Sequence, residues 1–219
     1  MNASVEKPGG RMAVAAGILA AFAVAGVGLV AFTELSTRER IAANERAYLL
    51  RALNEVVPAE AHDNDMFSDT VRVSDEELLG TPEPVTVFRA FSGAQPAAVI
   101  LTPIAPDGYS GTIRLLVGIA VDGRLTGVRV TSHRETPGLG DGIEAARSDW
   151  ILGFNGRSLD DPPRARWTVR RDGGDFDQFT GATITPRAVV KAVRNALLYF
   201  EKNGQALFDP RPENSGAGQ

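Results

Sequence analysis

The feature that most constrains this chain is the run of residues 12–32, which contains no charged side chain and consists mainly of Ala, Val, Gly and Leu. As an α-helix rising ~1.5 Å per residue, the run would cross the bilayer's hydrocarbon core of about 30 Å. A cleaved signal peptide is the alternative, but its apolar region covers only ~7–15 residues and ends at a small-residue cleavage site. This run is longer and ends in Phe32-Thr33-Glu34-Leu35. We therefore predict an uncleaved transmembrane helix over residues 12–32.

The charges beside this run do not decide its orientation. Lys7 and Arg11 precede it within a polar N-terminal segment, residues 1–11. Arg38, Arg40 and Arg46 follow it, so the positive-inside rule favours neither direction.

Residues 33–58 have the pattern of an amphipathic helix that links the membrane segment to a domain. Residues 36–39, Ser-Thr-Arg-Glu, fit a capping box and predict a helix start there. Pro58 follows the predicted end. The apolar residues that recur at helical spacing are Ile41, Tyr48, Leu49, Leu53 and Val56.

Residues 59–208 are predicted to form one α+β domain with a mainly antiparallel sheet and flanking helices. The strongest local signal is Asp122-Gly123 between two β-rich runs, which predicts a hairpin. Residues 59–83 are acidic and irregular, and the Pro/Gly-rich tail, 209–219, is predicted to be disordered. The expected strands are 85–91, 97–101, 112–121, 124–131 and 164–171, and the expected helices are 143–154 and 186–203, with Gly204 as C-cap.

The amino-acid composition limits the kinds of binding and catalysis that this chain can perform. A net charge of -4 and a pI near 5.3 give no electrostatic footprint for nucleic acid. The absence of cysteine excludes disulfides, iron–sulfur clusters and thiolate chemistry, and two histidines are too few for a His-rich metal site. Any redox activity would therefore depend on an organic cofactor.

Residues 177–187, here called the threonine segment, read Asp-Gln-Phe-Thr-Gly-Ala-Thr-Ile-Thr-Pro-Arg. Thr185 followed by Pro186 predicts a helix start with Thr185 as N-cap. Thr183 would then lie beside a helix N-terminus, whose free N–H groups favour phosphate. Gly181 and Ala182 leave room for a bulky group. An ordinary capped loop explains the same spacing.

Residues 133–142, here called the glycine-rich loop, read His-Arg-Glu-Thr-Pro-Gly-Leu-Gly-Asp-Gly. Its glycines allow close backbone approach to a ligand. The loop is not G-x-G-x-x-G and opens no βαβ unit, so a dinucleotide site is disfavoured. A hydrolytic His133 is also disfavoured because no nucleophile or third partner accompanies it. A polar residue that fixes the loop is the favoured interpretation of His133.

Residues 177–183 resemble the D-x-x-[S/T]-G-A-T flavinylation motif of the periplasmic FMN-binding domain family. Residues 108–111 (Gly-Tyr-Ser-Gly), 133–140, 149–154 (Asp-Trp-Ile-Leu-Gly-Phe) and 172–190 each resemble the G component of the Rnf (Rsx) electron-transport complex. The single N-terminal span followed by one domain resembles it too, so the resemblance covers nearly the whole chain.

The resemblance implies that Thr183 carries FMN through a phosphoester bond and that an ApbE-type flavin transferase attaches it. The transferase would recognise Asp177, Thr180, Gly181, Ala182 and Thr183. The remaining candidate cofactor-binding residues are Thr185, Glu135, Thr136, Gly138, Leu139 and Gly140, with Thr180, Gly181 and Ala182 also near the cofactor. No metal ligand or catalytic acid–base residue is implied.

The same resemblance implies a single-pass inner-membrane protein with a cytoplasmic N-terminus and a periplasmic domain. It would relay electrons with the other subunits of an Rnf-type complex, which couples electron flow between ferredoxin and NAD to ion movement. It would be an electron carrier rather than an independent catalyst. The alternatives are the FMN-bearing C component of a sodium-pumping NADH:quinone oxidoreductase and a cofactor-free, membrane-anchored assembly or binding subunit.

Overall fold

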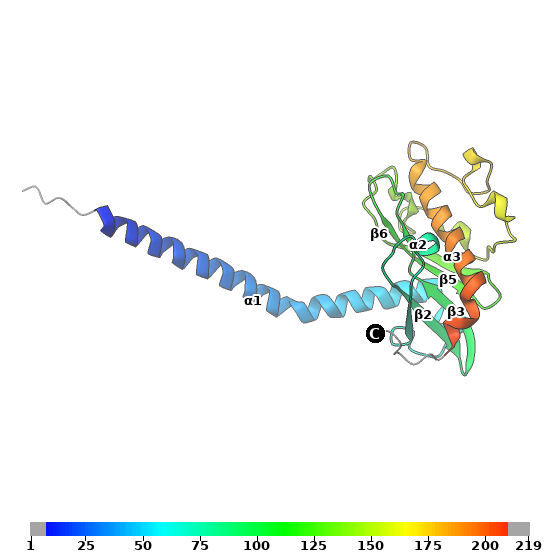
Figure 1. The fold of residues 1–219 in the computed structure, drawn as a ribbon, viewed down its shortest axis with the longest axis horizontal. Helices are drawn as coiled ribbons and strands as arrows, with labels where there is room; N and C mark the ends of the chain where they lie inside the picture. The colour runs from blue at the N-terminus through cyan, green and yellow to red at the C-terminus, as the bar shows by residue number, and fades with distance from the viewer. Residues whose placement is uncertain (1–7, 210–219) are drawn as a thin grey trace, which may run out of the picture. The chain divides into compact units, whose positions relative to one another are not determined.

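The structure, a computed structural model, describes residues 8–209 of the chain. It contains two compact units, one up to Leu49 and the other from Leu50 onward. The predicted N-terminal segment, apart from residues 8–11, and the predicted disordered tail, apart from Asp209, lie outside the described residues. The α-helices and strands, most of which are labelled in Figure 1, are α1 (Pro8–Val56), β1 (Thr70–Val73), α2 (Glu76–Leu79), β2 (Val85–Ser92), β3 (Gln95–Leu101), β4 (Ile104–Ala105), β5 (Ile113–Ala120), β6 (Leu125–Ser132) and α3 (Ile184–Phe208).

The first unit is the greater part of α1. Its stretch Met12–Arg38 has a mean hydropathy of 2.4 and buries none of its side chains within the protein. Large apolar side chains such as Phe22 and Leu29 are therefore exposed along it. By length and composition this stretch is able to cross a membrane, as the sequence predicts.

The predicted helix start at the capping box is wrong, because α1 continues through it. The hydroxyl groups of Ser36 and Thr37 donate backward to the carbonyl oxygens of Phe32 (2.7 Å) and Thr33 (2.8 Å). Such i−4 bonds accommodate Ser and Thr inside a helix, so these residues need not begin one.

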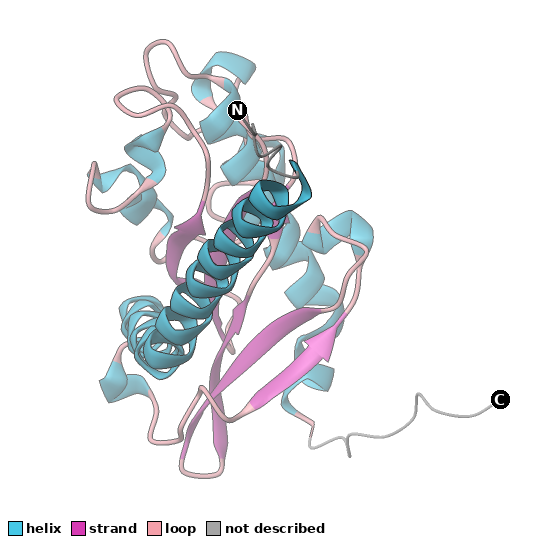
Figure 2. Ribbon diagram, turned by 90° about the vertical axis from the view of Figure 1, so that its left-hand side faces the viewer, coloured by secondary structure: helices cyan, strands magenta, loops and turns pink. Residues whose placement is uncertain are grey.

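The second unit is built on a six-stranded sheet in which every pairing is antiparallel. The strand order is β1-β2-β3-β5-β4, and β6 also pairs with β5 through the predicted hairpin. Figure 2 shows the strands as one twisted sheet flanked by helices. The predicted α+β architecture is confirmed.

The helix α3 packs on one face of this sheet. Its predicted apolar stripe is buried against β-strand side chains such as Val99, Val117 and Ile119. The helix does not end at Gly204 as predicted. Gly204 packs under the ring of Phe200, where an added Cβ would lie 3.1 Å from ring atoms, and Leu207 gains burial beyond it. The buried stripe comprises Val189, Val190, Val193, Ala196, Leu197 and Phe200.

The last turn of α1, within the second unit, covers the opposite face. Successive strand residues point to opposite faces, so Gly118 faces away from its neighbours Val117 and Ile119 and from α3. Gly118 pairs across strands with Gly127, and both glycines lie under Val56. A Cβ on Gly118 would lie 2.4 Å from a Val56 methyl carbon, and one on Gly127 would lie 3.1 Å from the Val56 Cα. This glycine pair thus forms a notch for the end of α1.

We expect Gly118→Ala to destabilise the second unit by about 1–3 kcal/mol, the usual cost of overpacking. Its Cβ would lie closer than van der Waals contact to both Val56 and the Thr126 hydroxyl. Gly153→Ala is the control, because Gly153 has no atom within 4 Å of an added Cβ. Thermal unfolding measures both, and equal midpoints for the two variants would contradict the notch.

Two predicted elements between β6 and α3 are wrong. The expected helix 143–154 consists of the 3₁₀ turns Asp141–Ile143 and Asp149–Phe154. Ser148 separates them, since its hydroxyl donates to the Gly142 carbonyl (2.6 Å) and accepts from the Trp150 N–H (3.3 Å). Ser148 is therefore the N-cap of the second turn, while the first turn ends at Ile143.

The expected strand 164–171 is instead the 3₁₀ turns Arg164–Arg166 and Arg170–Asp172. Its N–H groups bond locally, as when Arg166 donates to the Pro163 carbonyl at 2.7 Å. The alternation that suggested a strand is still real, because Trp167 and Val169 are buried between exposed arginines. The predicted irregular region 59–83 also contains β1, which pairs with β2.

Candidate functional site

The threonine segment makes a tight turn and then enters α3. The Ala182 N–H donates to the Phe179 carbonyl at 3.2 Å, and Gly181 has a φ of +84°, as the third residue of a type II turn requires. The helix begins at Ile184, and Thr183 occupies the N-cap position. Its side chain makes no capping hydrogen bond. The Thr183 hydroxyl therefore lies at a helix N-terminus without serving the helix.

The prediction that Thr185 caps the helix is wrong. Thr185 lies within the first turn of α3 and is fully buried. Its hydroxyl donates to the Oε2 atom of Glu135, which belongs to the glycine-rich loop and is itself only 4% exposed. The threonine segment and the glycine-rich loop thus meet through a buried hydrogen bond.

The glycine-rich loop is folded back on itself. The N–H groups of Leu139 (3.1 Å) and Gly140 (3.0 Å) both donate to the Thr136 carbonyl. Gly138 has a φ of +77°, and its N–H donates to the Asp141 carboxylate at 2.7 Å. These bonds fix the loop without using the side chains of Thr136 or Leu139, which stay exposed.

His133 holds the start of this loop. Its Nδ1 accepts the Glu135 N–H at 3.0 Å, and its Nε2 lies 2.6 Å from the Glu144 carboxylate. Accepting at Nδ1 leaves Nε2 to carry the hydrogen and donate to Glu144. With both ring nitrogens engaged and the side chain 11% exposed, His133 has the geometry of a loop-fixing residue.

The loop 108–111 joins the same junction. The Ser110 N–H donates to Oε1 of Glu135 at 3.0 Å. An added Cβ on Gly108 would lie 2.2 Å from the Gly111 carbonyl oxygen and 3.0 Å from Glu135 Oε1. Only glycine fits there without displacing these groups.

A cluster of aromatic side chains packs against the threonine segment. The Trp150 indole N–H donates to the Asp177 carbonyl at 2.8 Å, and its ring lies edge-on to Phe179 with centroids 5.3 Å apart. Phe179 packs on Gly142, where an added Cβ would lie 3.1 Å from the ring. Behind them, Trp167 and Phe176 stack with Phe154. All four segments that carry the family resemblance are therefore in contact.

Ion pairs flank the threonine segment at the surface. Arg187, in the first turn of α3, donates to both carboxylate oxygens of Asp172 at 2.7 and 3.0 Å. This hydrogen-bonded guanidinium lowers the pKa of Asp172 below its ordinary value, and the pKa of Arg187 is raised in turn. Asp177 pairs with Arg170 at 2.9 Å.

The structure divides the predicted site residues into two groups. Thr180, Gly181, Thr136, Gly138 and Leu139 are exposed, and Ala182 and Thr183 are partly exposed. An added Cβ on Gly181 would lie 3.5 Å from a Leu139 methyl group, so the two loops present adjacent surfaces. Glu135, Gly140 and Thr185 are buried beneath them.

Sequence reasoning missed two contributors to this surface. Ile184 is the first residue of α3 and is 44% exposed although the helix is largely buried. Its position directly after Thr183 in the sequence could have indicated that it lies at this surface. The Trp150 donor to Asp177 joins residues 27 positions apart, and no local pattern indicates such a bond.

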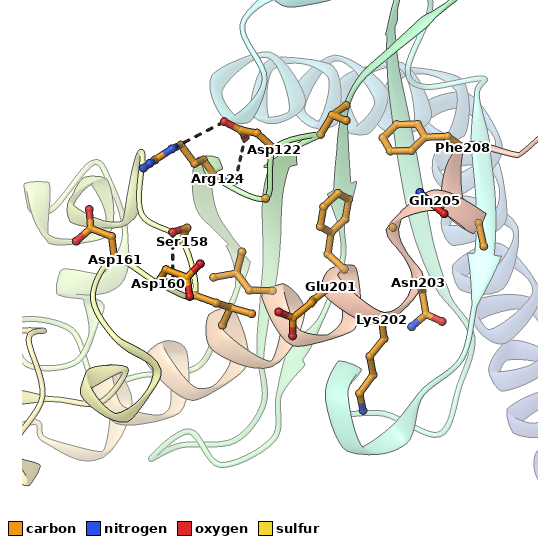
Figure 3. Close-up of a pocket in the computed structure, with 17 residues that line it drawn as sticks. Asp122, Arg124, Ser158, Asp160, Asp161, Glu201, Lys202, Asn203, Gln205 and Phe208 are labelled. Carbon is orange, nitrogen blue, oxygen red and sulfur yellow. Dashed lines mark hydrogen bonds and ion pairs between the residues drawn. The ribbon is translucent and has the colours of Figure 1, made fainter.

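A pocket of ≈ 1010 Å³ lies elsewhere, between the β5–β6 hairpin, residues 158–161 and the end of α3. Figure 3 shows its polar rim, which includes Asp122, Arg124 and Glu201. Its first α3 residue, Leu197, lies about 20 Å along the helix from Thr183 at 1.5 Å per residue. None of the four contacting segments contributes to its lining.

Comparison with known proteins identifies the chain's relatives. The family described as "RnfG N-terminal region" matches residues 1–56, and "FMN-binding domain" matches residues 108–198. The chain is 51% identical over 199 residues to the G component of the ion-translocating oxidoreductase complex of Vibrio atlanticus (strain LGP32), covering 91% of this chain and 94% of the relative. It is also 51% identical over 193 residues to the protein of the same name from Pseudomonas aeruginosa (strain UCBPP-PA14), covering 88% and 90%.

Among solved structures, the crystal structure of Shewanella oneidensis NqrC shares 20% identity with the chain. The overlap covers 68% of this chain and 72% of that one with a TM-score of 0.42, which is too low to support an inference.

Proposed function

Because this chain belongs to the family of G components of ion-translocating oxidoreductase complexes, we propose that it carries FMN on Thr183 and relays electrons within such a complex. The observation that carries the proposal is the position of Thr183. Thr183 is partly exposed at the N-terminus of α3, its side chain makes no capping hydrogen bond, and it belongs to one of the four segments that contact one another. The bond would be a phosphoester between the Thr183 Oγ1 and the FMN phosphate.

The residues present fit this cofactor. A phosphodiester keeps a negative charge, and the first-turn amides of a helix stabilise an anion at its N-terminus, although Pro186 offers no N–H. The exposed apolar surfaces of Leu139 and Ile184, with the adjacent Thr136 and Gly138, are suited to contact an aromatic ring. When bound, FMN supplies the electron-accepting and electron-donating chemistry, and the protein supplies its orientation and surroundings.

Attachment would require a flavin transferase of the ApbE type. In that reaction the Thr183 oxygen bonds to the FMN phosphorus of FAD, the pyrophosphate bond breaks, AMP leaves, and the hydroxyl proton is released. The side chains of Asp177 and Thr180 are exposed and Thr183 is partly exposed, so an enzyme can reach them. Gly181 and Ala182 keep the approach clear of large side chains.

We further propose a single-pass inner-membrane arrangement, with the N-terminus cytoplasmic and the FMN domain periplasmic. The apolar stretch of α1 supports the anchor, and the family supports membership of a membrane complex with other subunits. A covalent bond would keep the cofactor from being lost on the side of the membrane where free FMN is scarce.

The rival interpretations are weaker. The family assignment favours the G component over the C component of a sodium-pumping NADH:quinone oxidoreductase. The engaged ring nitrogens of His133 disfavour a hydrolase. A cofactor-free assembly subunit gives no reason for an N-cap residue, Thr183, whose side chain makes no capping hydrogen bond, or for the exposed glycine-rich loop near it.

The test is the mass of the full-length chain expressed with and without a flavin transferase. We expect a mass increase of one FMN less one water only when the transferase is present, and a tryptic peptide that carries the addition at Thr183. A second protein with the D-x-x-[S/T]-G-A-T motif, expressed in the same cells, shows whether the transferase is active. An unmodified chain beside a modified control would overturn the proposal in favour of the cofactor-free subunit.

A further inference from the structure

Among the side chains that the structure describes, the buried polar or charged ones are Glu135 and Thr185, and they are hydrogen-bonded to each other. Burying a carboxyl group is costly, and well-packed apolar residues often give equal or greater stability. The pair is therefore a poor means of stabilising the fold and invites a different explanation.

The carboxyl group of Glu135 joins three separate parts of the chain. One oxygen accepts from the Thr185 hydroxyl in the first turn of α3, and the other accepts from the Ser110 N–H in the loop 108–111. Glu135 itself lies at the start of the folded part of the glycine-rich loop, where its N–H donates to Nδ1 of His133. Two oxygens thus connect all three segments.

The surrounding glycines are matched to this carboxyl group. An added Cβ on Gly140 would lie 2.9 Å from the Glu135 Cβ and 3.1 Å from both Glu135 Oε2 and Thr185 Oγ1. An added Cβ on Gly108 would lie 3.0 Å from Oε1. Both glycines leave the space that the carboxyl group occupies, so the junction is closely built around it.

The junction lies two residues from the attachment threonine. Thr185 and Thr183 flank the first helical residue, so holding Thr185 sets the rotation of the first turn that presents Thr183. On the other side, Glu135 is followed directly by Thr136 and the exposed residues 138–139. The same hydrogen bonds therefore fix the positions of Thr183 and the loop surface relative to each other.

We propose that Glu135 is a positioning residue rather than a flavin contact. Its buried carboxyl group fixes the first turn of α3 against the glycine-rich loop, so that an FMN attached to Thr183 is held in one orientation. This inference rests on the proposed attachment of FMN to Thr183.

The experiment uses the full-length chain, flavinylated by a co-expressed transferase, in membranes or detergent. Time-resolved fluorescence anisotropy of the attached flavin and its midpoint potential are measured for Glu135→Ala, Glu135→Gln, Thr185→Val and Thr185→Ser. Thr102→Val is the control, because the Thr102 hydroxyl, just after β3, likewise makes one hydrogen bond, a part-buried one to the Thr86 carbonyl at 2.7 Å, away from the threonine segment.

We expect Glu135→Ala and Thr185→Val to gain a fast depolarising component that is absent from the wild type, together with a shifted potential. Thr185→Ser keeps the donor and Glu135→Gln keeps a group able to bond both partners, so both should behave as the wild type. Loss of attached FMN from Glu135→Ala and Thr185→Val, with an unchanged thermal midpoint and rescue in Thr185→Ser, would equally support positioning.

If Glu135→Ala does not fold, the Thr185→Val and Thr185→Ser pair decides the question. Wild-type anisotropy and potential in Thr185→Val would overturn the proposal and leave the pair a purely structural role, as would equal effects in Thr102→Val. Intact mass distinguishes failure of the positioning proposal from failure of the proposed function. If the wild-type chain carries no FMN although the transferase is active, both the attachment of FMN to Thr183 and the positioning role of Glu135 are refuted.

Discussion

Thr183→Ala is expected to abolish covalent flavin completely while leaving the chain folded. The hydroxyl of Thr183 caps nothing, and the side chain is only partly buried, so its loss removes the acceptor atom and little packing. A surface substitution of this kind usually changes stability by no more than about 0.5 kcal/mol. Flavin fluorescence in a denaturing gel and intact mass measure attachment, and thermal unfolding measures the fold.

Two neighbouring substitutions sharpen this result. Thr183→Ser keeps a hydroxyl at the same position and is expected to accept FMN. Thr180→Ala alters the recognition motif but leaves the acceptor, so any flavin that it carries should still map to Thr183. Flavin retained by Thr183→Ala, or mapped to Thr180 or Thr185 in the wild type, would refute the assignment.

Trp167→Ala is expected to lower the free energy of unfolding of the second unit by about 3–5 kcal/mol, the range for truncating a buried Trp side chain to Ala. Trp167 is 2% exposed, packs against Phe154 and Phe176, and donates its indole N–H to the Ser158 carbonyl at 3.0 Å. Truncation leaves a cavity behind the residues that support the threonine segment. For a unit of this size the thermal midpoint should fall by roughly 10 °C.

The control for this prediction is Trp167→Phe, which keeps the stacking but loses the indole N–H and part of the volume. It should cost distinctly less than the alanine variant, and its midpoint should lie between that variant and the wild type. If Trp167→Ala unfolds at the wild-type temperature, the aromatic side chains do not form the continuous support that the structure describes.

Local signals predicted the parts of the fold whose causes are local. The Asp122-Gly123 turn specifies the β5–β6 hairpin by its own backbone preference, and the apolar stripe of α3 follows from helical periodicity. The membrane-spanning pattern of residues 12–32 is equally local. The sequence motifs, rather than any periodicity, indicate the family to which the chain belongs.

Errors arose where a distant partner decides the structure. Thr185 has the sequence context of a cap, yet Glu135, 50 residues away, draws its hydroxyl into the core. Gly204 is a typical helix terminator, but Leu207 beyond it is buried in the same core cluster as the strand residues Val99 and Val117, so α3 continues past it. Alternation around Trp167 predicted a strand, but among the described residues no strand of the sheet pairs with this segment, whose Val169 forms an isolated bridge with Phe176. Sequence patterns cannot reveal such partners.

The notch formed by Gly118 and Gly127 determines where the chain can be shortened. Removing the apolar part of α1 is the natural route to a water-soluble fragment, and a cut at residue 59 would follow the proline that ends the helix. Such a cut would remove Val56 from the two glycines that it packs against, together with the buried side chains of Leu53 and Val57. A fragment that begins ahead of Leu50 retains these side chains, so the last turn of the anchor helix should be regarded as the first folded residues of the electron-carrying domain.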